Sequence, residues 1–542
     1  EVVAVDEEGN PVRDLTREDF TLYEDGQPVT VTNFFAVENG VRREGEEMVA
    51  EALPAAGETA AVPLPRLDEE RYVVVFVDNA NIAPNHRQRV FTELLDELDA
   101  LMQPADWVLV ASQERGVEIV QPFTRDRALV EAAALRVQRE TAAAGMRTAN
   151  LRQIERVIEG AQQPQFGTGG GGDGVGLFSS GATPTDEAIS TMADIQSYAG
   201  HTMNQLQQTL AALDQFVSSL SGLPGRKAVV YVSDGIELRP GERLFRLWED
   251  KFRLVQAETG VGSVDLEMER YSLENEFRRV IANANSNRVA FYTVEGGNDA
   301  ASGTVSAETR GVQLSASART ADGRRQASML QLANETGGTA LTGGAAVGGI
   351  LARLERDFSN YYSLGYPSPN RGDGKYHEVK VEVSRPGVRL RYLSGYRDKD
   401  KDERMTDSTL ASLLFDVGDN PLDVRVELGE QTKEKKGNEY VVPVMVKIPL
   451  SKLVLIPQQD AHLGQLSIFV AVRDDRGRMS APQKIEVPVQ IPNDQLLTAM
   501  SQTAGYLAQL RMRPGEQKIA VGVRDELAAS TSSLNLNVDV GQ

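Results

Sequence analysis

The chain contains no cysteine among its 542 residues. Disulfides, thiolate zinc sites and cysteine nucleophiles are therefore excluded together. Histidine is also scarce, and the four histidines, His86, His201, His377 and His462, lie in four separate segments. This distribution disfavours a metal centre built from several histidines. We expect each to be a surface residue or a hydrogen-bonded residue of the core.

Common catalytic motifs are missing as well. Neither the Gly-x-Ser-x-Gly elbow nor the zinc-protease pattern His-Glu-x-x-His occurs. The glycine-rich run at 167–176 follows a helical pattern and lacks a Gly-Lys-Ser/Thr ending, so it predicts a surface loop and not a phosphate site. The apolar stretch 441–456 is interrupted by two prolines and two lysines. The sequence therefore predicts no transmembrane segment.

Basic residues are outnumbered, with 57 Lys and Arg against 78 Asp and Glu and a formal charge of −21. Such a surface repels nucleic acid and anionic membranes, so neither is an expected partner. It suits divalent cations, basic protein partners, or solubility alone. The chain starts at Glu1 directly before a strand-like segment at 2–5, with no signal peptide in view. We expect a secreted, periplasmic or cell-surface protein whose signal peptide has been removed.

Two buried strands, each with an aspartate at its carboxyl end, carry most of the information. Residues 72–77 precede Asp78, and residues 228–233 precede Asp234. Both are runs of β-branched and aromatic residues without polar alternation, which is typical of strands covered on both faces. In an open α/β sheet, ligands bind at that edge. Two carboxylates there would suit Mg²⁺ or Ca²⁺.

The remaining pattern predicts several domains. Strand and helix patterns alternate from 72 to 354, which indicates a doubly wound, mostly parallel sheet. Alternating runs on either side predict that 1–38 pairs with 361–397 in one β-sandwich, because neither flank has enough strands alone. The expected segments are 1–38 (β), 39–71 (linker), 72–354 (α/β domain), 355–397 (β), 398–420 (linker and short helix) and 421–542 (β-sandwich). Residues 239–272 are charged and mixed, and we expect a surface helix there.

Several short sequence motifs together resemble those of a known family. The strand ending in Asp78, the segment Gly181-Ala-Thr183-Pro-Thr185 before a long helix, and Val232-Ser233-Asp234-Gly235 are similar to a von Willebrand factor type A domain. Further short motifs resemble the von Willebrand factor A-related proteins of the Acidobacteria. They lie at residues 14–20, 23–26, 225–227, 336–338, 361–366, 376–377 and 394–396. The resemblance covers about residues 2–397 and implies a Rossmann-like A-type domain at 72–354, inserted in a β-sandwich.

The resemblance also implies a metal-ion-dependent adhesion site. Asp78 matches the first aspartate of the family's Asp-x-Ser-x-Ser motif, Thr183 its threonine and Asp234 its last aspartate. The two serines are replaced by Ala80 and Ile82. Only three ligands remain, and water would have to complete the shell of Mg²⁺ or Ca²⁺.

Structural roles are the alternative for these residues. Asp78 and Asp234 could cap the following helices or hold turns, since aspartate is favoured at both places. Thr183 or Thr185 could be the N-cap of the long helix that follows.

Two classes of function agree with the sequence. The first is a non-catalytic extracytoplasmic subunit that binds other protein chains in a homo- or hetero-oligomeric assembly. The second is a metal-dependent accessory module of a partner enzyme. The missing catalytic motifs and the succession of modules favour the first.

Overall fold

The computed structural model describes most of the chain. The described residues are 1–43, 71–103, 106–114, 116–140, 144–161, 183–254, 256–260, 262–297, 316–342, 347–370, 373–434, 438–475 and 477–541. Residues 44–70 of the linker expected at 39–71 and the glycine-rich run at 167–176 lie outside them. Of the helices in the described part, none is long and apolar enough to cross a bilayer.

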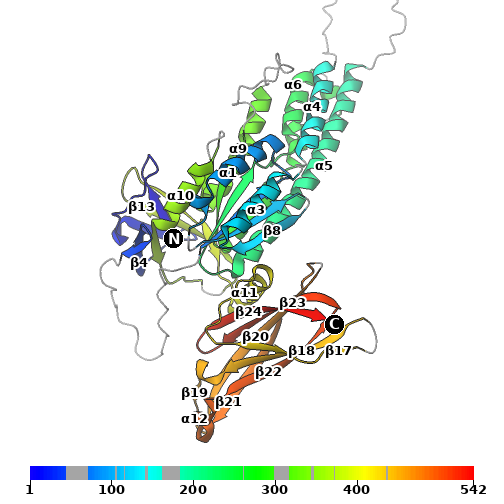
Figure 1. The fold of residues 1–542 in the computed structure, drawn as a ribbon. Helices are drawn as coiled ribbons and strands as arrows, with labels where there is room; N and C mark the ends of the chain where they lie inside the picture. The colour runs from blue at the N-terminus through cyan, green and yellow to red at the C-terminus, as the bar shows by residue number, and fades with distance from the viewer. Residues whose placement is uncertain are drawn as a thin grey trace, which may run out of the picture.

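A six-stranded α/β unit occupies the middle of the molecule (Figure 1). Its strand order is β11-β10-β9-β6-β7-β8, and all neighbours are parallel except β7 and β8. The strands are β6 (Arg71–Asp78), β7 (Asp106–Gln113), β8 (Val117–Thr124), β9 (Arg226–Ser233), β10 (Val289–Glu295) and β11 (Thr339–Leu341). The order reverses between β6 and β9, which is the switch point of a doubly wound sheet.

Helices cover both faces of this sheet. One face packs against α5 (Pro184–Ser219), α8 (Glu274–Ser286) and α9 (Ala316–Glu335). The other face packs against α1 (Pro84–Asp96), α2 (Leu98–Leu101), α3 (Arg127–Gln138) and α10 (Val347–Ser359). Side chains of β6 alternate between the faces, with Phe76 on the α5 side and Val77 on the α1 side. This alternation decides where the polar residues at the strand ends point.

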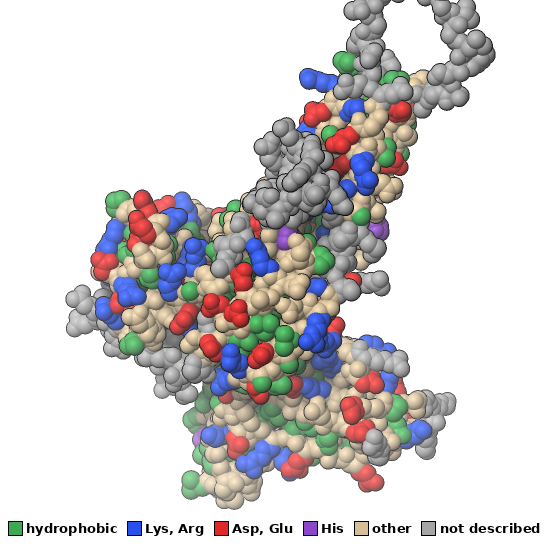
Figure 2. All heavy atoms as spheres, turned by 45° about the horizontal axis from the view of Figure 1, so that its top comes forward, with side chains coloured by type: hydrophobic (Ala, Val, Ile, Leu, Met, Phe, Trp, Pro, Cys, Tyr) green, Lys and Arg blue, Asp and Glu red, His purple; other side chains and the backbone are tan. Residues whose placement is uncertain are grey.

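A helical prong extends beyond the sheet. It contains the upper part of α5 with α4 (Ala144–Gly160), α6 (Glu242–Phe252) and α7 (Val264–Glu269), and it projects clearly in Figures 1 and 2. The surface helix expected at 239–272 is wrong, because Trp248 of α6 is fully buried and donates to the Ala188 carbonyl at 2.9 Å. The charges of this segment had concealed an apolar face that the prong needs for its own core.

Strands from both sides of the α/β unit form a split β-sandwich. One sheet has the order β14-β1-β12-β4-β5, and the other β15-β13-β2-β3. The first segment gives β1 (Val2–Val5), β2 (Phe20–Glu24), β3 (Gln27–Val29), β4 (Asn33–Glu38) and β5 (Val41–Arg43), and the second gives β12 (Tyr361–Gly365), β13 (Tyr376–Val383), β14 (Arg389–Tyr392) and β15 (Gly395–Arg397). The part of the expected linker at 41–43 is thus a strand, because Asn39 and Gly40 adopt positive φ angles and turn the chain back onto β4.

The C-terminal part is a second β-sandwich (Figure 1). One sheet contains β16 (Arg425–Leu428), β17 (Thr432–Lys433), β18 (Tyr440–Pro449) and β22 (Thr503–Met512). The other contains β19 (Ile456–Pro457), β20 (Ala461–Asp474), β21 (Gln483–Pro492), β23 (Gly515–Asp525) and β24 (Thr531–Val540), and the short α12 (Leu496–Ala499) joins β21 to β22. The multidomain α/β-plus-β organisation predicted from the sequence is confirmed.

Helix α11 (Lys401–Phe415) joins the C-terminal sandwich to the α/β unit. The linker and short helix expected at 398–420 are corrected here, because the Asp400 side chain caps α11 by accepting from the amides of Asp402 and Glu403, each at 2.8 Å. Phe415 packs in the α/β core, while Leu413 packs on the C-terminal sandwich. The charged residues 401–404, within the expected linker, are therefore the first turn of a helix that buries its apolar side chains farther along.

Candidate functional site at the carboxyl edge of the sheet

Asp78 and Asp234 lie at the same edge of the six-stranded sheet. Strands β6 and β9 are parallel neighbours, with Val77 paired to Val232. Asp78 ends β6, and Asp234 follows the last residue of β9. The switch point thus brings the ends of both strands together, and the direction of each carboxyl group decides what they can bind.

Asp78 points to the α5 side of the sheet and is fully buried. Its Oδ2 accepts hydrogen bonds from the Tyr231 hydroxyl at 2.5 Å, the Asn81 amide at 2.8 Å and the Ser233 hydroxyl at 3.2 Å. Its Oδ1 accepts from the Asn81 backbone at 3.1 Å. Burial raises the pKa of Asp78, although these hydrogen bonds and the charge of Arg147 oppose the rise. The carboxyl group holds the turn after β6.

Asp234 points to the opposite side, toward α1. Its Oδ2 accepts from the Ala83 amide at 2.8 Å, where α1 begins, and lies 2.9 Å from Nδ1 of His86. Its Oδ1 is buried without a hydrogen-bond partner among the described residues. A Cβ atom added to Gly296 would lie 2.7 Å from that oxygen, so the space beside it is already narrow. Asp234 therefore holds the start of α1 in place by a hydrogen bond.

An arginine supplies positive charge at this edge. Arg147 of α4 donates through Nη2 to the Ala80 carbonyl at 3.0 Å and to the Asn81 side-chain oxygen at 2.8 Å. Ala80 occupies the position of one missing serine, and Ile82, at the other, is fully buried in the apolar core. The guanidinium group thus binds the loop that follows β6.

A buried polar network lies next to these residues, and the sequence reasoning missed it. Asn79 donates to both Ser112 and Glu140 at 2.7 Å, and Ser112 donates to Glu140 at 2.7 Å. Arg87 of α1 donates to the Asn79 side-chain oxygen at 2.9 Å. Asn79 and Ser112 both lie at the ends of buried strands, which was a usable signal. No comparable signal marked Glu140, which follows α3.

Thr183 lies far from this edge. It caps α5, with its hydroxyl donating to Asp186 at 2.7 Å. Farther along the same helix, the Thr209 carbonyl accepts from Gln113 at 2.8 Å, and Gln113 is the strand partner of Asp78. The helix rises 1.5 Å per residue, so about seven turns, or ~39 Å, separate Thr183 from the level of Asp78. The threonine ligand implied by the resemblance is thus corrected to an N-cap.

These positions do not fit a divalent ion held by Asp78, Thr183 and Asp234. The two carboxyl groups point to opposite faces of the sheet, and the hydroxyl lies tens of ångströms away. Mg²⁺ needs near-octahedral oxygen coordination at 2.0–2.1 Å, and Ca²⁺ needs six to eight oxygens. The structural alternative, in which both aspartates hold turns and helix starts, agrees with the hydrogen bonds.

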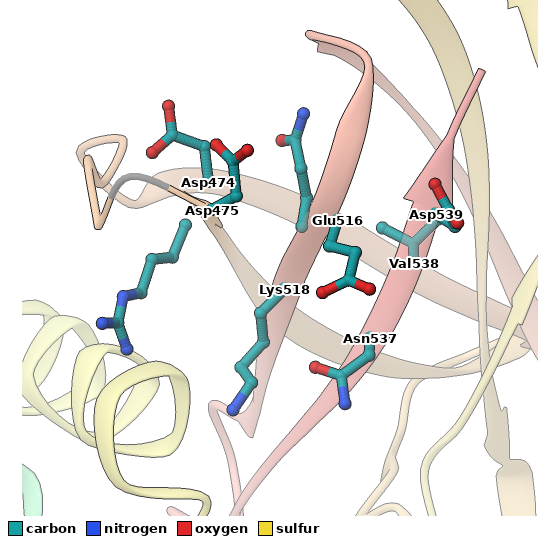
Figure 3. A pocket seen from close by; sticks show the side chains of 9 residues that line it. Asp474, Asp475, Glu516, Lys518, Asn537, Val538 and Asp539 are labelled. Atoms are coloured by element: carbon teal, nitrogen blue, oxygen red, sulfur yellow. The ribbon is translucent and has the colours of Figure 1, made fainter. Parts of the chain in front are cut away.

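A hollow lies on the C-terminal sandwich, with a volume of about 610 Å³ (Figure 3). Its lining includes Asp475, Glu516, Lys518 and Asp539 at the ends of β20, β23 and β24. Lys518 already forms an ion pair with Asp416 at 2.5 Å. The hollow is open to solvent and mixes charges of both signs, so it indicates no particular ligand.

Comparisons with known proteins give little further information. No family model matches the chain, and no curated protein matches it. The chain is similar to a solved structural-genomics target at 12% identity, with 22% of this chain and 84% of that one covered and a TM-score of 0.14. It is also similar to a structure described as the ApaA protein from Bordetella pertussis, at 14% identity over 22% and 90% of the chains, with a TM-score of 0.14.

A third similar structure is a mutant of the PilB minor pilin from Streptococcus sanguinis. The identity is 9%, the coverage is 66% of this chain and 87% of that one, and the TM-score is 0.24. TM-scores this low carry no argument about this chain.

Proposed function

We propose that this chain is a non-catalytic subunit that binds other protein chains outside the cytoplasm. In this proposal its α/β unit is a von Willebrand factor A-type domain with a degenerate metal-ion-dependent adhesion site. The observation that carries it is the sheet edge, where both aspartates are held by hydrogen bonds and Arg147 supplies the positive charge.

The topology supports the assignment to the A-type domain. Numbered along the chain, the sheet has the order 3-2-1-4-5-6, and only its third strand is antiparallel. This is the doubly wound order with the switch point between the first and fourth strands. Together with the sequence motifs around Asp78 and Asp234, this strand order favours the A-type domain over other doubly wound domains.

The chemistry of the edge supports binding over catalysis. A catalytic carboxylate needs a free oxygen within reach of a substrate, whereas Asp78 is fully buried and accepts four hydrogen bonds. Asp234 and His86 form a pair at 2.9 Å, but Asp234 also anchors the Ala83 amide. These groups hold the loops at the edge in place, which is what a rigid binding surface requires.

The helical prong provides the surface that we expect a partner to contact. It carries large apolar side chains in the open, with Val157, Ile189, Leu254 and Leu266 between 47% and 69% exposed. Exposed apolar side chains gathered on one projecting element are typical of protein-binding sites. The long reach of α5 places this surface away from the two sandwiches.

The test is assembly of the native protein. Size-exclusion chromatography with light scattering on material purified from its source should show a complex larger than one chain. The double variant Ile189→Lys with Leu266→Asp should reduce that complex at least tenfold, while the matched change Leu527→Asp on the C-terminal sandwich should leave it unchanged. A monomer without a partner at all concentrations would contradict the proposal, as would a turnover activity that Asp78→Asn abolishes.

A further inference from the structure

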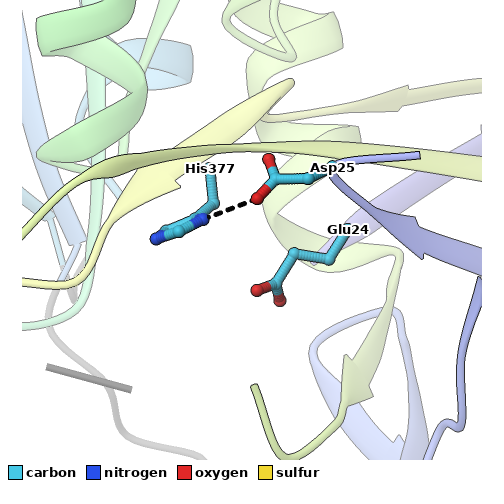
Figure 4. Close-up of side chains that lie close together, drawn as sticks. All are labelled: Glu24, Asp25 and His377. Atoms are coloured by element: carbon cyan, nitrogen blue, oxygen red, sulfur yellow. Dashed lines mark hydrogen bonds and ion pairs between the residues drawn. The ribbon is translucent and has the colours of Figure 1, made fainter. Parts of the chain in front are cut away.

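Three potential metal ligands meet in the split sandwich, far from the sheet edge. Glu24 is the last residue of β2, Asp25 follows it in the turn to β3, and His377 lies in β13, which pairs with β2. One ligand atom from each residue lies within 4.8 Å of the other two. Figure 4 shows the two carboxyl groups and the imidazole ring gathered around one small space. In the sequence, Glu24 and Asp25 precede the α/β unit and His377 follows it.

The His377 ring is held in an orientation suited to a metal ligand. The residue is 4% exposed, and its Nε2 lies 3.0 Å from a carboxyl oxygen of Asp373. Its Nδ1 faces Asp25 at 2.8 Å. Metal-binding histidines almost always place one ring nitrogen on the metal and donate the other N–H to a carboxylate or carbonyl. Asp373 is placed for that supporting role, which leaves Nδ1 for the ion.

Glu24 gives an independent indication of a ligand. It is 2% exposed, and its Oε1 accepts from the Ser368 hydroxyl and the Asn370 amide, each at 3.0 Å. Burial raises the pKa of the Glu24 carboxyl group, whereas the nearby Tyr366 hydroxyl helps to lower it below its usual value. Even so, Oε2 is buried with no donor in hydrogen-bonding geometry among the described residues. A buried carboxylate oxygen without a partner is costly unless something cationic binds it.

Asp25 completes the cluster and connects it to solvent. Its Oδ1 accepts from the Glu378 amide at 2.9 Å, which orients the group, and its side chain is 45% exposed. Asp25 and Gly26 form the turn between β2 and β3, both with positive φ. An ion can therefore reach the buried Glu24 and His377 from the side of this turn.

We propose that Glu24, Asp25 and His377 bind one Zn²⁺ ion, with Asp373 as the supporting carboxylate. One imidazole and two carboxylates are a ligand set that zinc accepts at about 2.0–2.2 Å, with water as the fourth ligand. On binding, Nδ1 gives up any proton that it shares with Asp25, and that proton passes to solvent. The ion links the β2–β3 turn to β13. It therefore connects the N-terminal segment of the split sandwich to the segment that follows the α/β unit. This proposal is independent of the proposed function.

The full-length chain, treated with a chelator and then dialysed, is titrated with ZnCl₂ by calorimetry, and its metal content is measured by elemental analysis. We expect one zinc per chain and a higher melting temperature with zinc. Glu24→Gln keeps the shape but removes the charge and should weaken binding at least tenfold, and His377→Gln should abolish it. Asp373→Asn, which changes only the support, should weaken binding about 10- to 100-fold.

His201→Gln is the matched control, because His201 lies on the exposed surface of α5 and pairs with Gln205 at 3.1 Å. It should bind zinc as the unchanged chain does. Circular dichroism at 20 °C confirms that each variant is folded before titration. The proposal is overturned if no stoichiometric zinc binds, or if Glu24→Gln and His377→Gln, both folded, bind it with unchanged affinity. It is equally overturned if His201→Gln removes the binding.

Discussion

The two β-sandwiches of this protein are built in different ways. The N-terminal one takes strands from two segments separated by the whole α/β unit, whereas the C-terminal one is continuous in sequence. The strands of the first have at most 8 residues, and β20 of the second has 14. Longer continuous strands bury more apolar surface for each connection that has to be ordered. The split sandwich must therefore draw stability from its neighbours.

The contact between the split sandwich and the α/β unit shows how this happens. Arg391 of β14 forms a two-pronged ion pair with Asp357 of α10, with distances of 2.7 and 2.5 Å. Asp357 is buried and also accepts from the Tyr292 hydroxyl of β10 at 2.9 Å. The C-terminal sandwich, by contrast, contacts the α/β unit through apolar side chains of α11.

The largest effect is expected from truncation. A chain without residues 1–43 leaves β12 and β13 without their main partner strands, so the split sandwich should unfold completely. A fragment of residues 398–541 should fold on its own, because it keeps α11 and both sheets. Amide hydrogen exchange measures both outcomes. Protected β12 and β13 amides in the truncated chain, or an unfolded fragment, would remove the distinction between the two sandwiches.

The ion pair at the junction should have the next largest effect. Arg391→Ala leaves the Asp357 carboxylate buried without its cation, which typically costs about 3–5 kcal/mol of unfolding free energy. The double change Arg391→Ala with Asp357→Asn should recover a large part of the loss. Lys447→Ala, which removes an exposed ion pair with Glu427 on the C-terminal sandwich, should cost less than about 1 kcal/mol. Urea unfolding compares all three variants, and equal losses from breaking the buried and the exposed ion pair would contradict the argument.

A buried lysine near the same junction predicts a pH dependence. Burial, with repulsion from Arg288, lowers the pKa of Lys227 to about 7, and its Nζ donates to the Leu223 carbonyl at 2.8 Å. Between pH 7 and about 10.4 the unfolded chain binds the proton that the folded chain lacks, so unfolding free energy should rise with pH in this window. Lys227→Met should remove that slope and stabilise the α/β unit at pH 7. Denaturant unfolding at several pH values measures it, and an unchanged slope would refute the assignment.

Of the changes at the two junctions, the smaller loss is expected at the second one, formed by α11. Leu413 of α11 is fully buried against Ala471 and Ala520 of the C-terminal sandwich. Leu413→Ala should cost about 2–5 kcal/mol, at the lower end because the site lies at the margin of the core. Thermal unfolding should show the loss in the C-terminal transition, with the split sandwich unaffected. A shift confined to the α/β unit would show that α11 belongs to that unit alone.

Much of the fold could be predicted from the sequence, but the site could not. Strands β6 and β9 were evident because their residues are apolar without interruption. Strand β22 is not evident from the sequence, because its alanine, leucine, glutamine and methionine residues favour helices. Helix α11 was shortened because Asp400, its cap, lies within a run of charges.

The direction of the two aspartates depended on register, which the sequence does not contain. With Val77 opposite Val232, Asp78 pairs with the level of Ser233, and Asp234 lies one residue farther on and faces the other side. A shift of one residue would have put both on one face. The position of Thr183 was predictable in principle. A helix of 36 residues is about 54 Å long, twice the ~26 Å length of an eight-residue strand, so its start had to overshoot the sheet.

Helix α11 has a mechanical consequence for the whole molecule. It crosses from one core to another, and at Gly222 the backbone of the α/β unit approaches Asp407 so closely that a Cβ atom would lie 2.1 Å from the carbonyl oxygen. A load applied to the C-terminal sandwich therefore cannot be taken up by slack chain between the domains. It passes through α11 into the base of α5 and from there along that helix to the prong.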